Sequence, residues 1–220
     1  MSEVCARLAS KNLPATVRRD WVMNANDSFW LPNPAQPIEN VAGIIGCEQC
    51  ERTMRTRMVS HYVLDRLARG KKESPASLRG HEHANRVMTG EVMRQNGGLD
   101  ALCDQTGETE ACNALHDWDG HSNKASRGYG LFEEFISRLP ASTSVTTGGV
   151  TQTVDHVWRV PFDPTDPLNT PRDLNTTDPL LVQAMSDAIA AVRAKKIPFN
   201  ATWGSLQVAG DRGAPPIPLG

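Results

Sequence analysis

The chain has 220 residues and a formal net charge of -2, with 39% hydrophobic residues, 15 prolines and 17 glycines. This length allows one domain or two small ones, and the proline and glycine content indicates much loop. The small net charge gives no electrostatic reason to expect a nucleic acid or an anionic membrane as partner. No apolar run is long enough to span a bilayer, and the N-terminus lacks the basic and apolar regions of a signal peptide.

The first informative stretch is a short apolar run, residues 21–23, that leads into the polar cluster Asn24–Ser28. A strand over residues 20–26 that delivers carboxamides into an aromatic-walled pocket has this pattern, because an amide donor is most effective where water is excluded. A turn after an edge strand has the same pattern, since Asn, Asp and Ser bond to nearby backbone groups. Composition alone favours the turn.

Helical periodicity follows a proline- and glycine-rich loop at residues 31–50. The spacing predicts a helix over 51–69, a second from 74 to 97, two short pieces within 99–118, and helices over 130–139 and 179–195. Asp178 is the expected cap of the last helix. Residues 151–160 alternate as a strand, whereas 141–150 and 163–178 are predicted as loops. We expect an α+β chain, mainly helical over about 51–195, whose few strands form no closed sheet. That pattern indicates an incomplete section of a larger fold.

The chain has five cysteines, an odd number that does not decide between a reduced and an oxidised compartment. Cys103 and Cys112 come within disulfide reach if the two short helices of 99–118 form an antiparallel pair. Cys47 and Cys50 have the spacing of a zinc or redox pair, but no second pair lies at ligand spacing. An unrelated helical domain that holds a metal with these two thiols is therefore one hypothesis.

Residues 24–34 read Asn-Ala-Asn-Asp-Ser-Phe-Trp-Leu-Pro-Asn-Pro, which resembles a signature of the penicillin acylase family. The match is to its acyl-homoserine-lactone acylase and aculeacin acylase branch. Three further segments resemble that family: residues 54–58, the run from Ala114 to Phe135, and residues 198–207. Their order and spacing agree with the family over most of residues 19–220. Members of this branch also tend to carry a cysteine pair at the positions of Cys103 and Cys112.

The resemblance implies an N-terminal-nucleophile hydrolase with an αββα fold and no cofactor. In such enzymes a serine hydroxyl attacks an amide carbonyl, and the α-amine of that serine acts as base. The resemblance assigns Asn26 as an oxyanion donor and Arg57 as the residue that polarises the amine, with Arg55 as the alternative. A guanidinium near the amine lowers the amine's pKa and keeps it neutral. Without the resemblance, a solvated arginine-rich helix face is the simpler interpretation.

The sequence also departs from the family, because no glycine is followed by the Ser-Asn-x-Trp-type start of a processed nucleophile, and the residues after Ser2 do not continue that motif. We expect residues 1–220 to be an internal section of the large subunit that is inactive alone. Its expected partners are the small (α) subunit, the rest of the large subunit and an acyl amide substrate: an acyl-homoserine lactone, a lipopeptide or a β-lactam side chain. The resemblance implies a periplasmic or secreted protein. The alternative is a non-catalytic remnant that binds an acyl chain or a partner.

Overall fold

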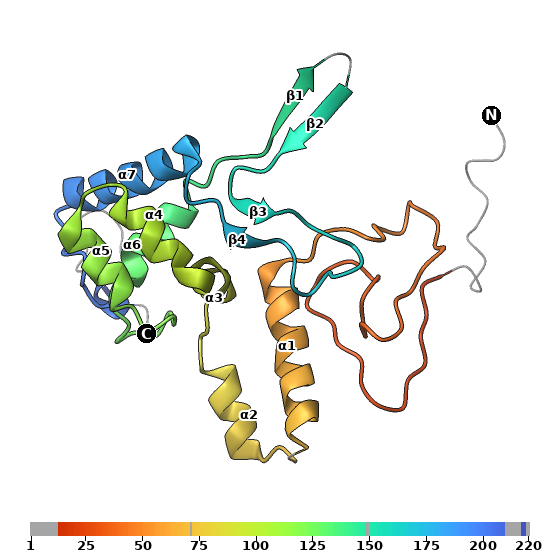
Figure 1. Cartoon of the computed structure of the whole chain (residues 1–220). Helices are drawn as coiled ribbons and strands as arrows, with labels where there is room; N and C mark the ends of the chain where they lie inside the picture. The colour runs from red at the N-terminus through yellow and green to blue at the C-terminus, as the bar shows by residue number, and fades with distance from the viewer. Residues whose placement is uncertain (1–12, 71, 148–149, 210–216, 219–220) are drawn as a thin grey trace. The chain divides into compact units, whose positions relative to one another are not determined.

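The computed structural model describes residues 13–70, 72–147, 150–209 and 217–218 (Figure 1). The chain divides into two compact units. Unit 1 is formed by residues up to Lys71 together with Phe162–Thr170, and unit 2 by Lys72–Pro161 and Pro171–Gly220. Ser2 lies outside the described residues. Of the helices in the described ranges, none is long and apolar enough to cross a membrane.

Unit 1 consists of a long loop segment and one helix, α1 (Met54–Arg69). The helix begins after Thr53, whose side chain accepts a hydrogen bond from the backbone N–H of Thr56. It ends at Gly70, where the backbone is left-handed with φ 61° and the N–H bonds to the Leu67 carbonyl. The predicted helix over 51–69 and its stop are therefore confirmed to within three residues.

The strand predicted over residues 20–26 is wrong. Met23 does donate its N–H to the Pro32 carbonyl at 2.8 Å, but residues 20–26 form no ladder of hydrogen bonds with a second strand. The Asn24 Oδ1 atom accepts the backbone N–H of Asn26 at 2.7 Å, and Asn26 is left-handed with φ 55°. This local bond turns the chain before a ladder forms, so the turn interpretation is correct for the backbone.

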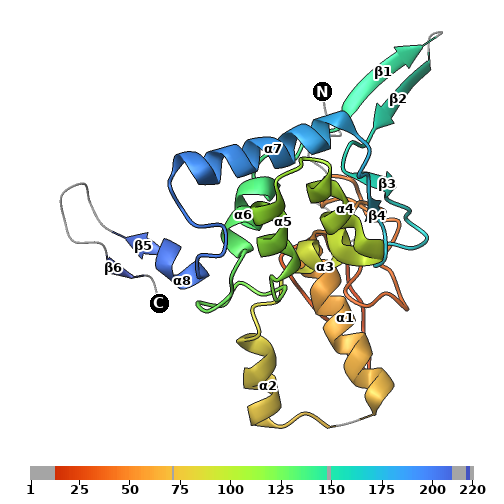
Figure 2. The same cartoon turned by 60° about the vertical axis from the view of Figure 1, so that its left-hand side comes forward.

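Unit 2 carries the other helices, which Figure 2 shows from a second side. The helix predicted from 74 to 97 is instead two helices, because Asn85 adopts a left-handed φ of 48° and breaks the helical hydrogen bonding. The predictions for 99–118, 130–139 and 179–195 are confirmed, with Asp178 accepting the Leu180 N–H at the start of the helix Pro179–Ala194. The helices of unit 2 are α2 (Pro75–Glu82), α3 (Met88–Arg94), the 3-10 turn η2 (Gln95–Gly97), α4 (Gly98–Asp104), α5 (Thr109–His116), α6 (Tyr129–Ile136), α7 (Pro179–Ala194) and α8 (Trp203–Leu206).

The strands of unit 2 pair two by two, antiparallel, among the described residues. They are β1 (Thr143–Thr147) with β2 (Val150–Val154), β3 (Trp158–Val160) with β4 (Arg172–Leu174), and β5 (Val208–Ala209) with β6 (Ile217–Pro218). The loops predicted over 141–150 and 163–178 are therefore partly wrong, and the strand predicted over 151–160 is two strands. The Asp155 carboxylate accepts the N–H groups of Val157 and Trp158 at 2.8 and 3.1 Å, which interrupts that strand.

The core of unit 2 is apolar and centres on Trp118, which is 2% exposed. Its ring stacks on Phe132 with a centroid distance of 4.5 Å, and its Nε1 donates to the His121 carbonyl at 2.7 Å. A Cβ at Gly90 would lie 2.5 Å from this indole, so only glycine fits there. Cys103 and Cys112 form a disulfide between α4 and α5, a pairing that the sequence allows but does not decide. The chain is thus α+β and mainly helical, as the sequence predicts.

Candidate functional site

The segment singled out in the sequence borders a pocket of about 620 Å³ in unit 1. We call residues Asn24–Ser28 the amide segment. Apolar side chains form much of the pocket wall, and polar atoms enter it from the amide segment and from α1. The pocket is lined by Pro14, Ala15, Thr16, Val22, Met23, Asn24, Ala25, Asp27, Ser28, Phe29, Leu31, Pro32, Ile38 and Thr56. A mostly apolar pocket with a few convergent polar groups is typical of small-molecule sites.

The two carboxamides of the amide segment have different positions. Asn24 lines the pocket, and its Oδ1 is used in the hydrogen bond to the Asn26 N–H. That bond leaves the Asn24 amino group, a two-proton donor, available. Asn26 is exposed and does not line the pocket, and its carboxamide makes no hydrogen bond within the part of the chain that the structure describes. The sequence selects Asn26, whereas the geometry adds Asn24 as a second candidate donor.

Asp27 connects the amide segment to the start of α1. Its Oδ2 accepts the Thr56 hydroxyl at 2.6 Å and the Thr53 N–H at 3.1 Å, while its Oδ1 accepts the Ser28 N–H at 2.7 Å. Burial alone would raise the pKa of this carboxyl, but these hydrogen bonds and the charge of Arg52 hold the pKa below its ordinary value. Asp27 is therefore a fixed anion at neutral pH.

The two arginines that the resemblance suggests have separate surroundings. Arg57 is 2% exposed, and its Nε donates to the Leu168 carbonyl at 2.8 Å. Burial lowers the pKa of its guanidinium, and the charges of Glu51 and Asp166 act in the opposite direction. Arg55 instead donates from Nη2 to the Ala25 carbonyl at 2.6 Å, so it is bound directly to the amide segment. Neither side chain is among those that line the pocket.

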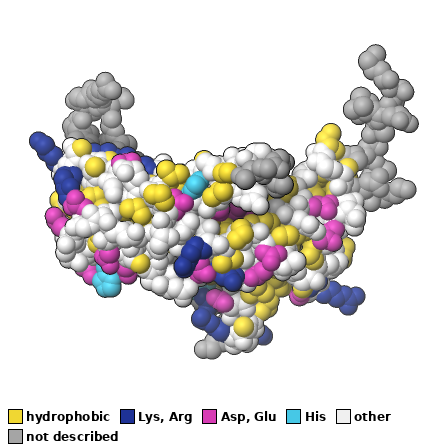
Figure 3. Space-filling view, turned by 45° about the horizontal axis from the view of Figure 1, so that its top comes forward, with side chains coloured by type: hydrophobic (Ala, Val, Ile, Leu, Met, Phe, Trp, Pro, Cys, Tyr) yellow, Lys and Arg dark blue, Asp and Glu magenta, His cyan; other side chains and the backbone are white. Residues whose placement is uncertain are grey.

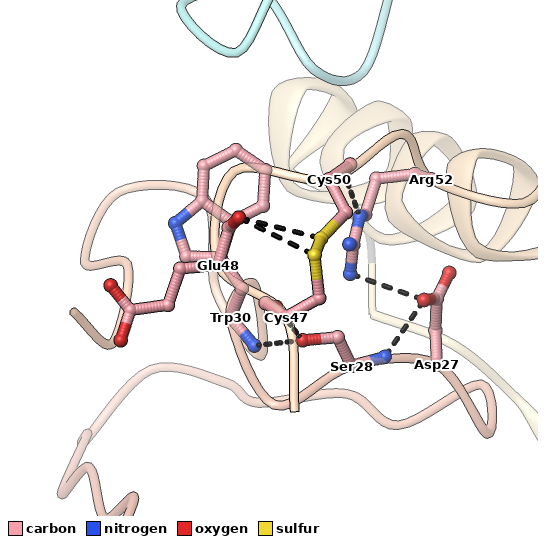
Figure 4. Close-up of a disulfide and its surroundings, with 7 residues drawn as sticks. All are labelled: Asp27, Ser28, Trp30, Cys47, Glu48, Cys50 and Arg52. Carbon is pink, nitrogen blue, oxygen red and sulfur yellow. Dashed lines mark hydrogen bonds and ion pairs between the residues drawn. A yellow bond between two sulfur atoms is a disulfide. The ribbon is translucent and has the colours of Figure 1, made fainter. Parts of the chain in front are cut away.

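A third arginine, Arg52, meets the amide segment beside the Cys47–Cys50 disulfide (Figure 4). Its Nη1 lies 3.2 Å from Asp27 Oδ1, its Nε donates to the Cys50 carbonyl at 2.9 Å, and its guanidinium lies 5.3 Å from the centre of the Trp30 ring. Because both sulfurs are used in the disulfide, the hypothesis of a metal held by these two thiols is wrong. No group of three potential metal ligands occurs in the described ranges.

Ser28 is the serine that lines the pocket, but its hydroxyl donates to the Cys47 carbonyl and accepts the Trp30 N–H at 3.3 Å. A serine nucleophile needs a base beside its hydroxyl, and here a carbonyl takes that place. Ser28 therefore does not supply the attacking group. The amide segment can instead offer the side-chain N–H groups of its asparagines to an oxyanion.

The sequence missed Asn24, Asp27 and Arg52 as members of this site. The signal that could have revealed Asn24 is the Asn-x-Asn spacing, because the first carboxamide of an Asx turn is held by the N–H two residues later, as Asn24 is by the Asn26 N–H. Asp27 and Arg52 lie 25 residues apart (52 − 27), and nothing in the local sequence joins them.

Figure 3 shows one face of the molecule with apolar, acidic and basic side chains interspersed, in line with the small net charge.

Comparison with known proteins gives a consistent result. The family model for penicillin amidase matches residues 5–218. An acyl-homoserine lactone acylase, PvdQ, of Pseudomonas fluorescens strain Pf0-1 is 34% identical over 217 residues, which cover 93% of this chain and 25% of that protein. Aculeacin-A acylase of Actinoplanes utahensis is 34% identical over 198 residues, which cover 82% of this chain and 23% of that protein. The chain thus spans about a quarter of the length of these relatives.

Proposed function

Because the chain belongs to the penicillin amidase family, we propose that it supplies the oxyanion-binding part of an amidohydrolase active site. The reaction is hydrolysis of the amide bond of an acylated small molecule through an acyl-enzyme. The observation that carries this proposal is the amide segment, whose carboxamides lie in and beside a 620 Å³ pocket of unit 1. The names of the relatives favour an acyl-homoserine lactone or a lipopeptide as substrate over a β-lactam.

In this proposal the nucleophilic serine comes from another polypeptide segment, such as those that make up the rest of the longer relatives. Asn26, with Asn24 as the second candidate, donates a hydrogen bond to the oxyanion of the tetrahedral intermediate. Arg57 polarises the amine of the nucleophile, and Arg55 is the alternative because it is bound to the Ala25 carbonyl. A small subunit is part of the assembly, which is periplasmic or secreted. The residues of this chain need no cofactor for that role.

The test measures release of homoserine lactone from a long-chain acyl-homoserine lactone. We expect no release by the 220-residue chain alone. We expect release when the chain replaces the matching segment of aculeacin-A acylase. In this hybrid enzyme, removal of the oxyanion donor is expected to lower kcat about 100- to 1,000-fold. Asn26→Ala and Asn24→Ala, measured side by side, show which carboxamide is that donor. Release by the chain alone that neither substitution reduces would refute the proposal.

A second measurement applies to the chain itself, whether or not the hybrid enzyme folds. The same lactone, titrated into the ¹⁵N-labelled chain, is expected to shift the side-chain amide signals of Asn24 or Asn26, because Asn24 lines the pocket and Asn26 follows two residues later in the same segment. A titration that leaves both signals in place counts against the site. The remnant alternative predicts shifts with no turnover in any hybrid, so the two hypotheses differ in the first measurement.

A further inference from the structure

The amide segment is held by contacts that the proposed chemistry does not use. Asp27, in the middle of the segment, receives hydrogen bonds on both carboxylate oxygens. One oxygen binds the N–H of its neighbour Ser28, and the other binds Thr53 and Thr56 at the first turn of α1. A carboxylate with partners on both oxygens has little rotational freedom, so the backbone that carries it is fixed against the helix.

Arg52 continues this chain of contacts. Its side chain is 1% exposed, and it reaches Asp27 with Nη1 and the Cys50 carbonyl with Nε (Figure 4). A buried guanidinium requires an anion and hydrogen-bond acceptors, because its desolvation is otherwise unfavourable. The position of Asp27 therefore depends on the position of the Cys50 carbonyl.

The loop of Cys47–Cys50 is itself well anchored. The disulfide joins two residues three apart, with a Cα–Cα distance of 6.0 Å. The Cys47 carbonyl accepts the Ser28 hydroxyl, so the loop binds the amide segment at a second point. The carboxylate of Glu48 accepts the backbone N–H groups of Asn40 and Val41 at 3.0 and 2.6 Å. One covalent loop thus contacts Ser28 directly and Asp27 through Arg52.

We propose that Asp27 is a positioning residue for the carboxamides of Asn24 and Asn26, and that the Cys47–Cys50 loop sets its position through Arg52. The proposal rests on the proposed function, because it concerns how that same site is held. It makes the site sensitive to thiol reductants, since Cys47 is exposed. A dithiol breaks the Sγ–Sγ bond by exchange: each cysteine sulfur gains a proton and the dithiol is oxidised to its own disulfide.

The first experiment uses the ¹⁵N-labelled 220-residue chain and the side-chain amide signals of Asn24 and Asn26. Asp27→Asn and the milder Arg52→Lys are expected to shift both signals by more than a linewidth. The matched control is Asp20→Asn, which breaks an exposed ion pair with Arg18 in the same unit and is expected to leave the signals in place. If Asp27→Asn fails to fold, the Arg52→Lys variant tests the proposal alone. Lysine keeps the positive charge but cannot contact Asp27 and the Cys50 carbonyl at the same time, as the guanidinium does.

The second experiment adds dithiothreitol to the same chain. In the wild type both signals are expected to move, whereas in Cys47→Ser/Cys50→Ser they lie at the moved positions from the start and do not respond. That variant keeps Cys103 and Cys112, so it separates the two disulfides. Signals that stay unchanged under reduction and in Arg52→Lys would overturn the proposal.

In the hybrid acylase, Asp27→Asn is expected to lower kcat about 10- to 100-fold, the range that misplacement of a catalytic group produces, with little change in KM. Failure of the proposed function is distinct from failure of this inference. If neither asparagine substitution affects turnover, the proposed site is wrong. If they abolish turnover while Asp27→Asn leaves kcat unchanged, only the positioning role is wrong.

Discussion

The two units of this chain are stabilised by different kinds of interaction. In unit 2, Trp118, Phe132 and the residues around them form an apolar core with hardly any exposed surface. In unit 1, the amide segment is held by an ion pair between the buried Arg52 and the partly buried Asp27, by hydrogen bonds to loop carbonyls and by a short disulfide loop. Apolar burial is non-directional, whereas a buried charge needs a partner of opposite charge and hydrogen bonds at defined places. The difference teaches that the candidate site is specified by contacts that depend on charge and redox state.

The largest expected effect is in the core of unit 2. Trp118→Ala removes the ring that stacks on Phe132 and should lower the free energy of unfolding by about 4 kcal/mol, the usual cost of truncating a buried aromatic. Leu78→Ala on α2 is the control, because Leu78 is 55% exposed. Chemical denaturation followed by circular dichroism measures both. Equal losses in the two variants would contradict the assignment of Trp118 to the core.

A smaller effect is expected in unit 1. Arg52→Met leaves Asp27 partly buried without its counter-charge and should cost about 3 kcal/mol, because removal of one partner of a buried pair is strongly unfavourable. Hydrogen exchange of the unit 1 backbone amides measures the loss locally. Arg18→Met is the control, since the pair of Arg18 and Asp20 lies on the surface and contributes little. If both substitutions change exchange equally, the polar network is not what holds the segment.

This comparison explains which parts of the molecule the sequence predicts. The helices α1, α6 and α7 follow from apolar periodicity and from caps such as Asp178, which are local signals. The break at Asn85 and the strand β1 do not, because left-handed asparagine and the pairing of β1 with β2 depend on neighbours in space. The residues of the candidate site show the same division between those that local sequence predicts and those that depend on neighbours in space. A motif match selects Asn26, but the pocket-lining position of Asn24 and the pairing of Asp27 with Arg52 come only from the folded loop.

The smallest expected effect tests whether charge also matters in unit 2. His156 Nδ1 lies 2.8 Å from Asp178 Oδ2, and Asp178 caps α7 through the Leu180 N–H. Burial would raise the pKa of Asp178, but the hydrogen bonds from His156 and Leu180 outweigh it and lower the pKa. A lowered carboxyl pKa contributes stability above the unfolded value of about 4, and this contribution is lost as the pH falls through the folded pKa.

We therefore expect Asp178→Ala to cost about 1 kcal/mol at pH 7, the usual value of a helix cap, and less at pH 3. Asp178→Asn should cost less than Asp178→Ala at pH 7, because asparagine caps helices nearly as well as aspartate and only the charge is lost. Asp187→Asn on the same helix is the control, since Asp187 is exposed and accepts a hydrogen bond from the Gln183 side chain. Urea denaturation at the two pH values measures all three. An effect of Asp178→Ala that is independent of pH would mean that the cap acts without its charge, and the reliance on fixed charges would then be confined to unit 1.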